Sequence, residues 1–224
     1  MIQRLEITRD TIESGQLEDF LVEVERQGLI TRSSPEYRNK TREQAISHFD
    51  QTEDIWLFAY GSLLWNPTIT YKEVRLGHLF GLHRRFCLKT VLGRGTPECP
   101  GLMLALDHGG SCKGLAYRIS REIADNELKL VWNREMVSSS YISKVVQLRT
   151  KTGRLKAITF AINRDDKKYA GKLSLTETAR IIAGSQGPMG SCRDYLFKTI
   201  DKLTQHGLMD SHLNNLAKLV KDQP

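Results

Sequence analysis

Glu135 combines a reactive side chain with an unusual position. At about 100° per residue it falls on the apolar side of an expected helix. That stripe consists of Leu128, Val131, Trp132 and Met136. Loss of water around a carboxylate raises its pKa, which suits a general acid or base working near neutral pH. The alternative is a structural ion pair with an arginine such as Arg84, Arg85 or Arg94, and the helix alone does not separate the two interpretations.

The turn Tyr60-Gly61-Ser62-Leu63 is the second candidate for chemistry. It follows the apolar run 55–59, and an unbroken apolar run is typical of a strand buried on both faces. Glycine allows a sharp turn and a close approach of ligand to backbone. The N–H groups of such a turn can bind an anion or an oxyanion. On this pattern alone, a core strand with an ordinary turn is the simpler interpretation.

Cofactor and metal sites are not indicated by the remaining reactive residues. The cysteines lack CxxC spacing, so we expect reduced thiols and neither a disulfide nor a zinc framework. They are Cys87, Cys99, Cys112 and Cys192. The six histidines are scattered, which makes a metal site unexpected. The glycine-rich segments 93–101 and 184–190 match neither GxGxxG after a strand nor a Walker loop, so no nucleotide cofactor is expected.

Composition indicates a globular protein. The chain has 224 residues, of which 40% are hydrophobic and 26% charged, enough for one domain with an additional arm. Its net charge of +7 comes from basic residues interspersed with acidic ones, without a nucleic-acid-binding motif. A positive field that attracts a small anionic substrate explains this charge as well as nucleic-acid binding does, and a solvated basic surface with no role is a simpler interpretation than either. No apolar stretch approaches the ~20 residues that span a bilayer, and residues 1–16 lack the apolar core of a secretory signal. These features predict a cytoplasmic protein with no membrane partner.

Two regions differ in pattern. Residues 1–52 read as a helical extension, with an apolar stripe through Leu17, Leu21 and Val24 and a second helix over 41–49 capped by Thr41. Residues 53–224 read as the main domain. We expect its strands over 55–60, 75–79, 85–91, 102–106, 114–119, 141–148 and 155–162, with turns at Gly81, at 107–110 and at 152–153. We expect helices over 120–137, 174–183, 195–205 and 211–221, the first capped by Ser120 and the second by Ser174.

The segments 58–67 and 132–136 together carry a family resemblance. The chain resembles the ChaC-type γ-glutamylcyclotransferases, which act on glutathione. Further matching segments, in the same order as in the family, are 83–87, 93–97 and 187–190, the last followed by Tyr195-Leu196. The resemblance covers about residue 55 to the C-terminus. The first ~50 residues resemble an extension of bacterial members.

This resemblance implies an α+β fold of the γ-glutamylcyclotransferase type, a small bent mixed sheet or barrel surrounded by helices. The implied reaction is that of a lyase, which converts glutathione to 5-oxoproline and Cys-Gly without a metal or organic cofactor. We also expect a monomer.

The resemblance also implies site residues. Glu135 is the acid/base, and Tyr60, Gly61, Ser62 and Leu63 hold the γ-glutamyl group. A further tyrosine contributes to substrate binding in related enzymes, and its best match is Tyr169, with Tyr141 and Tyr195 as alternatives. Arg94 lies in a matching segment and is expected to bind substrate.

Three alternatives to the glutathione-directed enzyme stay open. One is a cyclotransferase for other γ-glutamyl peptides or amines, since the γ-glutamyl pocket would be the same. The segment 94–101 is expected to decide between these substrates. Another is a non-catalytic regulator linked to cation transport, which an acidic residue at position 135 disfavours. A basic nucleic-acid-binding module comes last.

Overall fold

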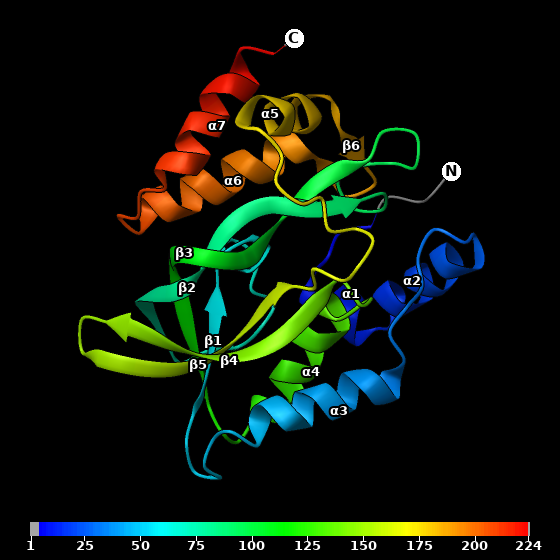
Figure 1. The fold of residues 1–224 in the computed structure, drawn as a ribbon. Helices are drawn as coiled ribbons and strands as arrows, with labels where there is room; N and C mark the ends of the chain where they lie inside the picture. Colours follow the sequence, from blue (N-terminus) through cyan, green and yellow to red (C-terminus); the bar gives the residue numbers. More distant parts are fainter. Residues whose placement is uncertain (1–4, 224) are drawn as a thin grey trace.

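A five-stranded closed barrel forms the centre of the molecule. The computed structural model describes residues 5–223. The barrel strands are β1 (Ile55–Ala59), β2 (Glu73–Thr90), β3 (Gly101–Ile119), β4 (Tyr141–Thr150) and β5 (Gly153–Ile162). Their order is β1-β3-β2-β4-β5, and the sheet is strongly bent, as Figure 1 shows. The barrel closes because β1 also pairs with β5, in parallel, at Leu57 and Ile158.

The first strand is buried along its whole length, as its unbroken apolar run predicted. All five residues of β1 are buried, and they pair antiparallel with residues 115–119 of β3. A strand in the middle of a closed sheet has packed neighbours on both faces, so no polar face is needed. Its carboxyl end runs directly into the turn at Gly61 and the short 3-10 helix η1 (Ser62–Leu64).

Two predicted turns lie inside long strands instead. Gly81 and the segment 107–110 were expected to be turns, but β2 and β3 pair with each other over 73–90 and 101–119. At this point Phe80 pairs with Ser111 and Leu82 with His108, so the register shifts around the glycines. Gly81, Gly109 and Gly110 have positive φ, which lets both strands bend without ending. The prediction of turns at these two places is therefore wrong, because the pairing between β2 and β3 continues on both sides of the glycines.

The helix that carries Glu135 is shorter than predicted. Helix α4 (Ala124–Glu135) begins after Ile123, not after Ser120, and it ends at Glu135 rather than at 137. The backbone N–H of Arg121 donates to the Asp54 carboxylate at 2.9 Å. This bond keeps residues 120–123 in a turn, so the helix starts one turn later.

The N-terminal region forms three helices beside α4. These are α1 (Arg9–Glu13), α2 (Gln16–Arg26) and α3 (Pro35–Ile46), drawn in blue in Figure 1. The last begins at Pro35, not at Thr41 as predicted. Ser34 accepts a hydrogen bond from the Tyr37 N–H at 3.1 Å, and proline at the first helical position needs no N–H partner. Thr41 instead lies within the helix and donates to the Tyr37 carbonyl.

Three C-terminal helices cover the other side of the barrel. They are α5 (Leu175–Gly184), α6 (Cys192–Gln205) and α7 (Ser211–Lys221), with a two-stranded β6 (Gln186–Gly187) and β7 (Gly190–Ser191) between the first two. Ser174 caps α5 as predicted, through a bond from the Glu177 N–H at 3.1 Å. Figure 1 places this group opposite the N-terminal helices, with the barrel between them. Among residues 5–223, no helix combines the length and apolar character needed to cross a bilayer.

Candidate active site

A cavity of about 360 Å³ lies where the β1–η1 turn meets the end of α4. This volume is within the range of small-molecule sites, about 300–1,000 Å³. Its lining includes eight of the nine residues that the sequence singled out, and the exception is Tyr169. The residues brought together are Tyr60, Gly61, Ser62, Leu63, Arg94, Glu135, Tyr141 and Tyr195, the last two of which were alternatives to Tyr169.

Glu135 is held at the last position of α4 with its side chain largely withdrawn from water. The helix buries the predicted apolar stripe, and the Glu135 side chain is only 13% exposed. Burial raises the pKa of the Glu135 carboxyl, while the charge and hydrogen bond of Arg134 oppose that rise. The alternative interpretation from the sequence was an ion pair of Glu135 with Arg84, Arg85 or Arg94. The structure instead pairs Glu135 Oε1 with Arg134 Nε at 3.0 Å.

Arg134 joins the carboxylate to the turn, a role that the sequence analysis missed. Its guanidinium donates to Ser62 Oγ at 2.9 Å, to Thr68 Oγ1 at 3.3 Å and to the Asn66 carbonyl. The side chain is 4% exposed. One planar cation therefore fixes the position of Glu135 relative to the turn. The only feature of the sequence that could have indicated this role of Arg134 was its place beside Glu135 in the segment 132–136, which matches the family.

A second arginine holds the start of the turn from behind. Arg84 donates to the Tyr60 carbonyl through Nε, to Asp210 Oδ2 at 2.6 Å and to the Lys113 carbonyl at 2.7 Å. With all of these donors engaged in protein contacts, Arg84 supports the turn from outside the cavity. The turn is thus fixed on two sides by buried guanidinium groups.

Three tyrosines of the cavity keep neutral hydroxyl groups. Burial is the main cause that raises the pKa values of Tyr60, Tyr141 and Tyr195 well above the ordinary value of 10. The Tyr141 hydroxyl donates to the Leu104 carbonyl at 2.8 Å. A Cβ atom built on Gly61 would lie 2.8 Å from the Tyr195 hydroxyl. Only glycine leaves room for that hydroxyl against the turn.

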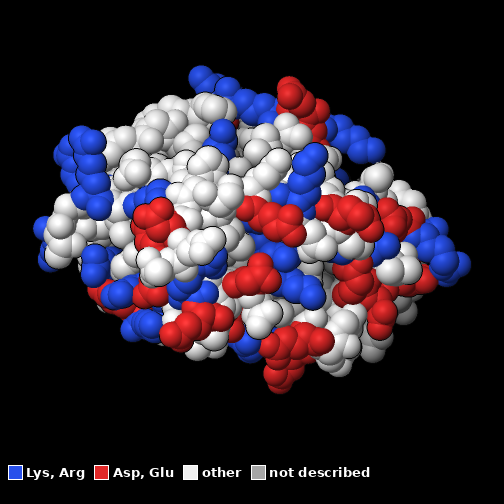
Figure 2. All heavy atoms as spheres, turned by 90° about the horizontal axis from the view of Figure 1, so that it is seen from below, with Lys and Arg blue, Asp and Glu red and all other residues white. Residues whose placement is uncertain are grey.

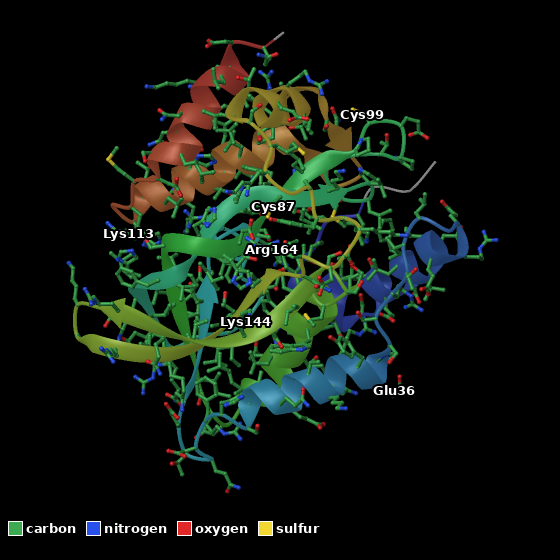
Figure 3. All side chains as sticks on the ribbon, in the orientation of Figure 1. Glu36, Cys87, Cys99, Lys113, Lys144 and Arg164 are labelled. Atoms are coloured by element: carbon green, nitrogen blue, oxygen red, sulfur yellow. The ribbon has the colours of Figure 1, made fainter. Side chains whose placement is uncertain are left out.

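Tyr169 does not line the cavity, although it was the preferred tyrosine in the sequence. Its hydroxyl donates to Asp107 Oδ2 at 2.9 Å. The Asp107 side chain is fully buried, and Arg164, labelled in Figure 3, pairs with its other oxygen at 2.6 Å. Tyr169 thereby belongs to a buried charge network beside Cys87. The cavity receives Tyr141 and Tyr195 instead.

Arg94 brings to the cavity a positive charge that is not held in an ion pair among the described residues. Its guanidinium donates to the Ser191 carbonyl at 3.2 Å and lies 5.6 Å from the centre of the Tyr195 ring. Within the part of the chain that the structure describes, it forms no ion pair with a carboxylate, and burial lowers its pKa. A buried guanidinium that is not ion-paired, with Asp194 acting on its charge only at longer range, suits an anionic ligand.

The cavity carries more positive than negative side chains. Its basic lining residues are Arg94, Arg134, Lys89, Lys168 and Lys198, and the acidic ones are Glu6 and Glu135. Such a site attracts a small anion. Over residues 5–223, no three His, Cys, Asp or Glu side chains converge in a way that could hold a metal ion.

Comparison with known sequences places this geometry in a family. The family model described as "ChaC-like protein" matches residues 55–223. The chain is 40% identical over 168 residues to the glutathione-specific γ-glutamylcyclotransferase of Escherichia coli strain K12, covering 75% of this chain and 73% of that protein. It is 31% identical over 173 residues to the human glutathione-specific γ-glutamylcyclotransferase 1, covering 74% and 78%.

Solved structures match the fold. A yeast γ-glutamylcyclotransferase specific to glutathione superposes with a TM-score of 0.68 at 24% identity, covering 75% of this chain and 96% of that one. YkqA from Bacillus subtilis gives a TM-score of 0.53 at 22% identity, covering 82% and 60%. The predicted fold class, an α+β fold of the γ-glutamylcyclotransferase type, is confirmed.

Proposed function

Because this chain belongs to the ChaC-like protein family, we propose that it is a glutathione-specific γ-glutamylcyclotransferase, which converts glutathione to 5-oxoproline and Cys-Gly. The observation that carries the proposal is the arrangement of one largely buried carboxylate, Glu135, tied through Arg134 to the Gly61–Ser62 turn inside a cationic cavity. A protein that only binds its partner has no need of a carboxylate with a raised pKa at this position.

The reaction needs one proton to be moved between two nitrogen atoms. The α-amine of the γ-glutamyl group, neutral after its ammonium form has released one proton to water, attacks its own γ-carbonyl carbon to form the ring C–N bond and gives a second proton to Glu135. Glu135 then returns the proton to the nitrogen of Cys-Gly as the original amide bond breaks. The carboxylate is regenerated, and the γ-carbonyl oxygen stays in the 5-oxoproline ring. A raised pKa brings Glu135 closer to the working pH for both transfers.

Substrate placement is assigned to the turn and to Arg94. Ring closure is intramolecular, so holding the γ-glutamyl chain folded contributes much of the rate, about 7–11 kcal/mol in the most favourable systems. In our proposal the Tyr60–Leu63 turn holds the γ-glutamyl group, with Tyr141 and Tyr195 beside it. Arg94 binds one of the two carboxylates of glutathione, which would supply the direct ion pair that it lacks within the described residues.

We also propose an oligomeric state, a cellular location and a domain organisation for the enzyme. We propose a monomeric cytoplasmic enzyme that needs no cofactor, with a helical extension over 1–52 and a catalytic domain over 53–224. Figure 2 shows acidic and basic side chains side by side over one face of the molecule, which favours a small substrate over a nucleic acid.

A substrate comparison tests the proposed function. Purified protein is incubated separately with glutathione and with γ-Glu-Ala, and 5-oxoproline is quantified by mass spectrometry. We expect release from glutathione and at least about ten times less from γ-Glu-Ala, because a peptide lacking the thiol and glycine loses leaving-group contacts. Equal turnover of the two would support the broader γ-glutamyl-peptide enzyme instead. No 5-oxoproline from either would contradict the proposal.

The pH dependence of kcat follows from the raised pKa of Glu135. Glu135 must be ionised to accept the proton, so kcat falls as the pH drops through the pKa of this carboxyl in the enzyme–substrate complex. Because burial raises that pKa, the half-maximal point of the acid limb is expected above the ordinary glutamate value of 4.5. Initial rates at saturating glutathione across pH 4–8 measure it. An acid limb at or below 4.5 would show that Glu135 is not the titrating base.

Gly61→Ala is expected to lower kcat/KM for glutathione by about 100-fold. The new Cβ would lie 2.8 Å from the Tyr195 hydroxyl, so the turn or the ring must move, and displacements of about 1 Å can cost that much. A double-mutant cycle with Tyr195→Phe removes the obstructing oxygen. We expect Gly61→Ala to cost at least tenfold less in that background. Equal costs in both backgrounds would show that the steric account of Gly61 is wrong.

A further inference from the structure

The N-terminal arm, defined here as residues 5–30, lines the same cavity as Glu135. The aliphatic side chains Leu5 and Ile7 come from the segment before α1, Leu17 and Leu21 from α2, and Ile30 from the segment after it. Glu6, whose side chain is exposed, is the only charged lining residue of the arm. The family model begins at residue 55, so this wall of the cavity comes from outside the matched region.

The arm is fastened at points next to the catalytic residues. Asn66, which follows the turn, donates through Nδ2 to the Ile7 carbonyl at 2.7 Å. Arg9 forms two bonds to the Glu127 carboxylate on α4, at 2.8 and 2.9 Å. The Ser33 N–H, just after the arm, donates to the carbonyl of Val137 at 2.8 Å, two residues beyond Glu135. These bonds hold the arm in place against α4 and the turn.

Apolar packing places the arm between the two polar parts of the site. Leu17, Leu21 and Ile30 belong to one buried cluster with Leu130 of α4. Leu92 and Val137 pack against that cluster from the barrel side. Leu92 precedes Gly93-Arg94, and Val137 follows the end of α4. The arm therefore spans the cavity from the Arg94 loop to the Glu135 helix.

The chemistry of this wall indicates which part of the substrate it contacts. The γ-glutamyl group carries an ammonium and a carboxylate, both of which need polar partners, and apart from the exposed Glu6 the side chains of this wall supply none. The glycine carboxylate is better matched by the cationic residues of the cavity. Apart from the γ-glutamyl methylenes, which the Tyr60–Leu63 turn holds in our proposal, the cysteinyl CH2–SH group is the uncharged, polarisable portion that gains from aliphatic contact.

We propose that the N-terminal arm forms the specificity wall for the cysteinyl side chain of the leaving group, an inference that rests on the proposed cyclotransferase function. The arm thus sets which peptide is expelled, while the barrel and α4 perform the ring closure. Shortening a wall residue should make room for a larger group on sulfur, and a gain of this kind cannot result from a loss of folding.

The test compares glutathione with S-methylglutathione in full-length variants. In Leu21→Ala and Ile7→Ala, the kcat/KM ratio of S-methylglutathione to glutathione is expected to rise about tenfold over the wild type, the scale of one methylene in a pocket. Val22→Ala is the matched control, because Val22 neighbours Leu21 on α2 but is 46% exposed. Its ratio should equal that of the wild type.

This inference would be overturned if the wild-type protein turns over glutathione but the kcat/KM ratio is unchanged in both Leu21→Ala and Ile7→Ala. That result would leave the proposed function intact. An equal rise in the Val22→Ala control would overturn the inference as well. If wild-type protein releases no 5-oxoproline from glutathione, the proposed function fails, and the inference fails with it. Thermal melting of each variant accompanies the assays, although the ratio within one variant is independent of the folded fraction.

Discussion

Replacing Glu135 by glutamine is expected to lower kcat for 5-oxoproline release by about 10²–10⁴-fold, the usual contribution of a positioned acid or base. Glutamine has nearly the same shape and can still accept a hydrogen bond from Arg134, but it cannot take a proton from the substrate amine. KM should change little, since the turn and Arg94 are untouched. Steady-state kinetics and a melting curve measured on the same preparation separate loss of chemistry from loss of fold.

Glu127→Gln is the matched control on the same helix. Glu127 is also a buried glutamate of α4, but its carboxylate accepts bonds from Arg9 and from the Thr70 N–H, and it does not line the cavity. We expect this change to lower the free energy of unfolding by about 1–3 kcal/mol, the value of bonds to a charged group, with kcat within about threefold of the wild type. Similar losses of kcat in the two variants would show that any buried α4 carboxylate matters only for structure.

The second large effect is expected at Arg134. Arg134→Met removes a guanidinium that bonds Ser62, Thr68 and the Asn66 carbonyl and leaves the Glu135 carboxylate without its ion pair. Breaking a buried pair in this way costs about 3–5 kcal/mol of stability. Misplacement of the turn relative to the base should reduce kcat/KM by at least about 100-fold. Arg134→Lys keeps the charge but cannot reproduce the planar set of donors, so most of the activity loss should remain.

The pH profile separates the two roles of Arg134. The positive charge lowers the pKa of Glu135, in opposition to burial, so its removal raises that pKa further. The acid limb of the residual activity in Arg134→Met should therefore move to higher pH. In Arg134→Lys, which retains a cation, the limb should stay closer to that of the wild type. An acid limb in Arg134→Met that coincides with the wild type would contradict the electrostatic role and leave only the positioning role.

Local patterns were sufficient for the parts of the site that depend on local structure. The burial of β1 and the turn at Gly61 that follows it are indicated by a single apolar run ending in Gly-Ser, and the place of Glu135 on an apolar helix stripe follows from the helical period. Both can be recognised without knowing what they pack against. The α+β fold and the order of its helices and strands came from the family resemblance together with these patterns.

Features that depend on contacts between residues far apart in the chain could not be predicted from local sequence patterns. The turn predicted at Gly81 is part of β2 because β3 pairs with the strand on both sides of it. Arg134 and Ser62 are 72 positions apart, so their bond depends on how α4 packs against the β1 turn. The bond between Arg9 and Glu127, which fastens the arm to α4, joins residues 118 positions apart and could not be predicted from local patterns either. Tyr169 and Tyr195 are alike as residues, and only the fold directs Tyr195 into the cavity.

In the proposed reaction the γ-glutamyl amine itself, not water, attacks the γ-carbonyl. The most direct test is turnover of glutathione in water enriched in ¹⁸O, with both products analysed by mass spectrometry. We expect equimolar 5-oxoproline and Cys-Gly, with no ¹⁸O in the 5-oxoproline, because the carbonyl oxygen is retained on ring closure. Release of glutamate carrying one ¹⁸O atom would show that the enzyme hydrolyses the bond, and would contradict the account.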